Sequence, residues 1–128
     1  MKHSVMLNIA TLLSVLLFSL HTADDIVRGF EPGTAANLPA IPIFVVWMYG
    51  ALVLAERRSG YIITLLGGLL ALAAPILHMT GKGVGGEFAR SSGALFFIWT
   101  IIALGVTALF SVILSVQGLW SLRRGGRW

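Results

Sequence analysis

The stretch "ALFFIWTIIALGVTALFSVIL", Ala94 to Leu114, decides the fold of this chain. No charged residue and no histidine interrupts it, and the same character extends from Gly93 to Trp120. A helix needs about 20 apolar residues to cross the hydrocarbon core of a bilayer. This stretch therefore predicts a transmembrane helix, long enough to tilt or to project beyond the bilayer.

Three further apolar stretches have a similar composition. The four predicted spans cover residues 5–22, 38–55, 61–79 and 93–120. Together they take up most of the 128 residues and leave no room for a soluble domain. We expect residues 1–128 to form a single integral membrane domain. The predicted fold class is an all-α membrane protein, a bundle of four transmembrane helices.

The overall composition agrees with a bilayer as the solvent of this chain. Hydrophobic residues make up 57% and charged residues only 11%, against about 25% charged residues in soluble domains. The net charge of +4 could indicate a nucleic-acid partner in a soluble protein, but here the basic residues flank the spans, so we expect none. Cysteine is absent, which excludes disulfides, thiolate metal sites and thiol catalysis.

The distribution of basic residues predicts the orientation. With four spans, both termini and the short turn "ERRSG" (56–60) share one side of the membrane. That side has one acidic residue, Glu56, and six basic ones: Lys2, Arg57, Arg58, Arg123, Arg124 and Arg127. Basic residues near short loops mark the cytoplasmic side. We therefore expect a multi-pass protein of a bacterial-type inner membrane, with both termini cytoplasmic (N-in/C-in).

The first span also has the pattern of a secretory signal peptide, because such peptides begin with a basic residue, here Lys2, followed by an apolar run. Cleavage after Ala23 would place His21 at the third residue before the cut, where a small residue is expected. We therefore favour a first helix that is not cleaved.

Ionisable residues gather where the first span leaves the membrane. His21, Asp24, Asp25 and Arg28 follow one another at i, i+3, i+4 and i+7. If the helix continues past the membrane surface, their side chains lie along one stripe of it. This is the helical arrangement of a metal or proton site.

A second histidine, His78, lies near the outer end of the third span. The first and third spans both run outward, and parallel helices of a four-helix bundle are commonly diagonal, so their inward side chains can meet. We expect His21 and His78 to lie at similar depth. The predicted ligands are His21, Asp24, Asp25 and His78, with Arg28 in support of a carboxylate. Two imidazoles and one or two carboxylates suit Zn²⁺ or Fe²⁺.

Other interpretations of the same residues stay open. Asp24 and Arg28 have the i, i+4 spacing of an ordinary helical ion pair. Histidines near a membrane surface often bond to a loop carbonyl. Two histidines on diagonal helices could instead ligate haem b. A transporter is a further alternative, but no ionisable residue lies in the middle of any span, where transport sites usually have one.

A different class of function is an accessory or assembly subunit that binds partner membrane proteins through its helix faces. Small residues let helices approach closely, within one chain, in a homo-oligomer or with a partner membrane protein. The third and fourth spans each carry such a face, made of Gly67, Ala71 and Ala74, and of Ala108, Ser111 and Ser115.

Overall fold

The structure, a computed structural model, describes residues 2–80 and 92–125. Its four α-helices are α1 (Lys2–Val27), α2 (Ala40–Leu52), α3 (Arg58–Thr80) and α4 (Ala94–Arg123), and a short 3-10 helix, η1 (Ala35–Asn37), precedes α2. All regular elements in the described ranges are helical, which confirms the predicted all-α class. All four helices, α2 together with η1, are long and apolar enough to cross a membrane.

The predicted bounds differ from those of the helices by one to five residues, and two of the differences matter for the fold. The helix predicted to end at residue 22 continues to Val27, so Asp24 and Asp25 are helical and Arg28 directly follows the helix. The span predicted to reach residue 55 ends at Leu52. There the amides of Val53 and Leu54 both bond to the carbonyl of Tyr49, at 2.9 and 3.2 Å, and the chain turns toward α3.

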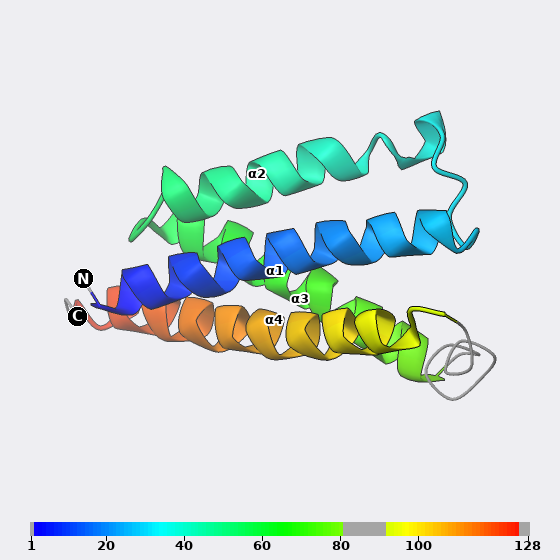
Figure 1. Ribbon diagram of the computed structural model, residues 1–128. Coiled ribbons are helices and arrows are strands. Elements are labelled where there is room, and N and C mark those ends of the chain that lie inside the picture. The colour runs from blue at the N-terminus through cyan, green and yellow to red at the C-terminus, as the bar shows by residue number, and fades with distance from the viewer. Residues whose placement is uncertain (1, 81–91, 126–128) are drawn as a thin grey trace.

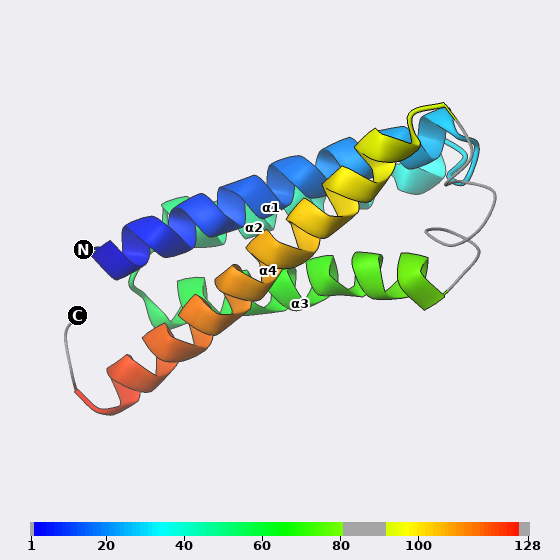
Figure 2. The same cartoon turned by 60° about the horizontal axis from the view of Figure 1, so that its bottom comes forward.

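Successive helices run in opposite directions, and the N-terminus and the end of α4 lie at the same end of the bundle (Figure 1). α4 packs extensively against both α1 and α3, whereas α1 and α3 contact each other only lightly. Figure 2 shows why: α4 crosses the bundle obliquely, from the C-terminal end of α1 to the N-terminal end of α3. The ends of α1 and α3 and the start of α4 therefore share one end of the bundle, opposite the termini.

The small-residue faces of α3 and α4 are used inside the bundle. Ala71 and Ala108 are completely buried in one core cluster, together with Leu104 and Trp47. Small residues permit this close approach because their short side chains let the backbones of two helices come near each other.

Hydroxyl groups add polar contacts between α4 and its neighbours. Such interhelical hydrogen bonds stabilise membrane bundles by about 0.6 kcal/mol each on average. Side-chain hydroxyls join α4 to α1 and α3 in three pairs: Thr11–Ser111 at 3.0 Å, Ser14–Thr107 at 3.0 Å and Thr64–Ser115 at 2.8 Å.

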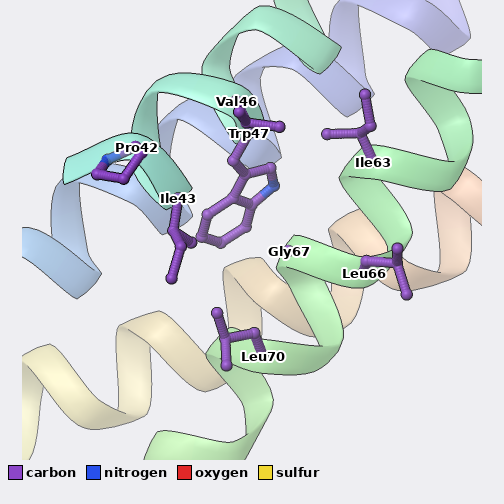
Figure 3. Close-up of a pocket in the computed structure, with 8 residues that line it drawn as sticks. All are labelled: Pro42, Ile43, Val46, Trp47, Ile63, Leu66, Gly67 and Leu70. Carbon is purple, nitrogen blue, oxygen red and sulfur yellow. The ribbon is translucent and has the colours of Figure 1, made fainter. Parts of the chain in front are cut away.

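An apolar cavity of about 400 Å³ lies between α2 and α3 (Figure 3). The buried indole of Trp47 forms one wall and covers Gly67, where an added Cβ atom would overlap the ring. The lining contains no ionisable group, so we assign no chemistry to this cavity. The remaining lining residues are Pro42, Ile43, Val46, Ile63, Leu66 and Leu70.

The outer surface of the bundle is strongly apolar. Large hydrophobic side chains are exposed on all four helices, for example Leu16, Ile41, Leu66 and Phe110. Soluble monomers rarely expose contiguous apolar patches of more than a few hundred Å². In this bundle, apolar side chains face outward as well as toward the core, unlike those of a typical soluble monomer.

Candidate metal centre

His21 of α1 and His78 of α3 meet at the end of the bundle opposite the termini. Their Nε2 atoms are 2.9 Å apart, and the two rings are nearly perpendicular, with an interplanar angle of 88°. His21 is 3% exposed, and the side chain of His78 is 25% exposed. The predicted approach of these two histidines is confirmed: α1 and α3 run in the same direction and bring both rings to the same depth.

Asp25 completes a triangle with the two histidines. Its Oδ2 lies 3.3 Å from His21 Nε2 and 3.7 Å from His78 Nε2. Because α1 continues to Val27, Asp25 follows His21 by one helical turn and faces the same way. Across the two described ranges, these three residues form the one group of three ligand-type side chains close enough together to hold a metal ion.

The end of α1 fixes the backbone of Asp25. The carbonyl of Asp25 accepts a hydrogen bond of 2.8 Å from the amide of Phe30, and the amide of Gly29 bonds to the carbonyl of Ile26 at 3.1 Å. Gly29 has a φ of 80°, the left-handed conformation that commonly terminates a helix. The turn after α1 therefore holds the last helical turn, and the carboxylate on it, in place.

The spacing of the three donor atoms suits a small metal ion. Ligands bound tetrahedrally to Zn²⁺ at about 2.0–2.2 Å are separated from one another by about 3.3 Å. The three separations here, 2.9, 3.3 and 3.7 Å, lie on both sides of that value. Two imidazole nitrogens and one carboxylate oxygen also form a donor set typical of Zn²⁺ and Fe²⁺ sites.

Asp24 and Arg28 do not join the group. Arg28 Nε donates a hydrogen bond of 2.8 Å to Asp24 Oδ2, and both side chains are largely buried. The guanidinium also lies over the ring of Phe97, 5.4 Å from its centroid. Arg28 thus holds a carboxylate, as expected, and the alternative interpretation of Asp24 and Arg28 as an i, i+4 ion pair is confirmed. The predicted ligand Asp24 points to Arg28 because the two are one turn apart, while Asp25 faces the histidines.

Phe97, near the start of α4, forms an apolar wall of the site that the sequence pattern does not predict. It is fully buried, and its ring centroid lies 5.8 Å from that of His21 and 5.3 Å from that of His78. Its only signal in the sequence is its place at the outer end of the fourth apolar run. Phe97 restricts the rotation of both imidazoles and excludes water from one side of them.

Two buried polar atoms of the site have no hydrogen-bond partner within the described ranges: His21 Nδ1 and Asp25 Oδ1. A histidine that binds metal usually donates its other N–H to a neighbouring acceptor. Here packing against Phe97 and His78 orients the ring of His21 instead. The second carboxylate oxygen of Asp25 remains available as a further oxygen donor.

The contact between the two histidines also separates this site from a haem site. Two axial histidines lie on opposite faces of a porphyrin, whereas the Nε2 atoms here approach within hydrogen-bond distance of each other. The separation of the two Nε2 atoms favours a small ion or a shared proton.

No family model, no curated protein and no solved structure matches this chain. The chemistry of the site is therefore the basis for assigning a function.

Proposed function

We propose that this chain is an integral membrane protein that binds a divalent transition-metal ion, Zn²⁺ or Fe²⁺, between His21, His78 and Asp25. The observation that carries the proposal is the triangle of donor atoms, with sides of 2.9, 3.3 and 3.7 Å. The buried atoms His21 Nδ1 and Asp25 Oδ1 support it, because unpaired polar atoms in a buried site indicate that a partner such as an ion belongs there.

The proposed setting is a bacterial-type inner membrane, with both termini in the cytoplasm. The apolar side chains exposed on all four helices support insertion. The excess of arginine in the 56–60 turn and at the end of α4 supports the orientation. In this orientation the metal site lies near the non-cytoplasmic surface of the inner membrane. The length of the bundle separates the site from the cytoplasm.

The residues of the site would hold the ion with an open position. His21 and His78 offer neutral nitrogen donors at Nε2, and the carboxylate of Asp25 offers one negative charge that offsets part of the charge of the ion. An ion held by three protein ligands can act as a Lewis acid toward a small molecule in its remaining position. Phe97 packs against both imidazoles and limits their rotation.

Two neighbouring aspartates provide a direct test of the proposed ligand set. We expect Asp25→Asn to weaken Zn²⁺ binding by roughly 100-fold or more, because it removes a ligand, and loss of an outer-shell partner alone costs 10–100-fold. Asp24→Asn removes the same charge one residue away and should change the affinity by no more than about threefold, since Asp24 pairs with Arg28. Isothermal titration of the detergent-purified full chain with Zn²⁺ measures both.

The comparison of these two variants separates coordination from general electrostatic attraction. If Asp24→Asn and Asp25→Asn weaken binding equally, the carboxylates act only through their charge, and the proposed set of ligands is wrong. Circular dichroism of both variants checks that the helices are retained.

A further inference from the structure

A second cavity lies at the opposite end of the bundle from the metal site, where α3 begins and α4 ends. It has a volume of about 350 Å³ and is lined by Arg58, Ile62, Leu119, Leu122 and Arg123. Arg58 is the first residue of α3 and Arg123 the last of α4. The aliphatic residues lie up to one turn closer to the middle of each helix. The lining thus combines two positive charges at the helix ends with an apolar wall.

The two arginines of this cavity have no acidic partner among the residues that the structure describes. Within residues 2–80 and 92–125, no carboxylate lies within ion-pair distance of Arg58 or Arg123. The acidic residue nearest to Arg58 in sequence, Glu56, accepts a hydrogen bond of 2.9 Å from Ser4 Oγ. The neighbouring Arg124 is engaged differently, because its guanidinium stacks 4.3 Å from the ring centroid of Trp120. Arg58 and Arg123 are therefore available to an anion.

We propose that this cavity binds an anionic phospholipid, with the phosphate between Arg58 and Arg123 and an acyl chain along Ile62, Leu119 and Leu122. Guanidinium groups bind phosphate oxygens in a bidentate manner. Basic pockets between transmembrane helices on the cytoplasmic side bind anionic headgroups. The aliphatic wall favours a lipid over free phosphate, because inorganic phosphate gains nothing from an apolar surface. The inference rests on the proposed membrane insertion but not on the metal site.

The two adjacent arginine pairs supply a matched test. The variant R58Q/R123Q removes two positive charges from the cavity, and the variant R57Q/R124Q removes two from the same membrane face outside it. We expect native mass spectrometry of the full chain, with added phosphatidylglycerol, to show binding weakened about tenfold or more in R58Q/R123Q. R57Q/R124Q should bind phosphatidylglycerol within about threefold of the parent, and phosphatidylcholine should bind the parent at least tenfold more weakly.

A conservative pair distinguishes geometry from charge. R58K/R123K keeps both charges but loses the planar fork of the guanidinium, so we expect phosphatidylglycerol binding several-fold weaker than in the parent. This pair also provides the test if R58Q/R123Q does not fold, because lysines at exposed helix ends leave the charge balance unchanged.

Three results would overturn the lipid site. Equal weakening in R58Q/R123Q and R57Q/R124Q would show diffuse attraction to the basic face. Equal affinity for phosphatidylglycerol and phosphatidylcholine would exclude recognition of the anionic headgroup. Displacement of phosphatidylglycerol by millimolar inorganic phosphate would identify a site for a free anion instead. Zn²⁺ affinity should not change in any arginine variant, because the metal site lies at the other end of the bundle, so the two proposals succeed or fail independently.

Discussion

The double variant His21→Ala/His78→Ala is expected to lose high-affinity Zn²⁺ binding, with the affinity lowered by roughly a thousandfold or more. It removes both nitrogen donors, whose Nε2 atoms are 2.9 Å apart, and leaves the carboxylate of Asp25 as the only ligand of the triangle. Loss of a single outer-shell partner already costs 10–100-fold in metal affinity, and loss of two direct ligands costs more. Competition titration against a chelator, together with elemental analysis of the purified protein, measures the effect.

His3 offers the matched control for this variant. It lies in the first turn of α1, at the end of the bundle away from the site, with its ring centroid 6.2 Å from that of Tyr61. His3→Ala therefore removes one imidazole from the same helix without touching the site and should bind Zn²⁺ like the parent. The metal proposal fails if the double variant binds Zn²⁺ as tightly as His3→Ala does, with both proteins folded.

Gly67→Ala is expected to destabilise the bundle by about 1–3 kcal/mol, because the added methyl group would overlap the indole of Trp47. Gly105→Ala is the matched control on α4. A Cβ atom there would lie 3.5 Å from Pro75 Cγ, an ordinary van der Waals contact. That substitution should leave the stability unchanged or raise it by up to about 1 kcal/mol through helix propensity. Thermal unfolding in detergent, followed by circular dichroism, compares the two variants.

A double variant shows whether the steric contact is the cause. In Trp47→Ala/Gly67→Ala the ring that the methyl group would meet is gone, so the cost of the glycine substitution should largely disappear relative to Trp47→Ala alone. If Gly67→Ala and Gly105→Ala have the same effect, or if the cost of Gly67→Ala persists without the indole, the packing of α2 on α3 is not as described.

Much of the fold could be predicted because long apolar helices carry a strong signal in the sequence. Uninterrupted apolar runs such as 93–120 fix the number and approximate bounds of the helices. The end of α2 could not be placed, because Val53 and Leu54 are as apolar as the helix before them and only their hydrogen bonds to Tyr49 mark the turn. The small-residue faces were visible in the sequence, but their use inside the bundle depends on the oblique course of α4.

The candidate site could be predicted only in part. The meeting of His21 and His78 follows from the shared direction of their helices and from their equal depth. The order of the spans gives the direction, and the number of residues from the start of each span gives the depth. The choice between Asp24 and Asp25 could not be made, because i+3 and i+4 lie on the same stripe and the pairing with Arg28 decides it. Phe97 was missed because an aromatic residue within an apolar run carries no mark of its contacts.

The cavity between α3 and α4 was outside the reach of the sequence for another reason. Arg58 and Arg123 could be interpreted as signals of orientation, but they are 65 positions apart, and their approach depends on how α4 crosses α3. The crossing of α3 and α4, which creates this cavity, therefore required the structure.

X-ray absorption at the zinc edge, recorded on the full chain loaded with one equivalent of Zn²⁺, tests the metal site most directly. We expect two imidazole nitrogens at about 2.0–2.1 Å, with their ring scattering, and oxygen donors at about 2.0–2.2 Å. A spectrum with oxygen ligands alone and no imidazole scattering would contradict the site formed by His21, His78 and Asp25.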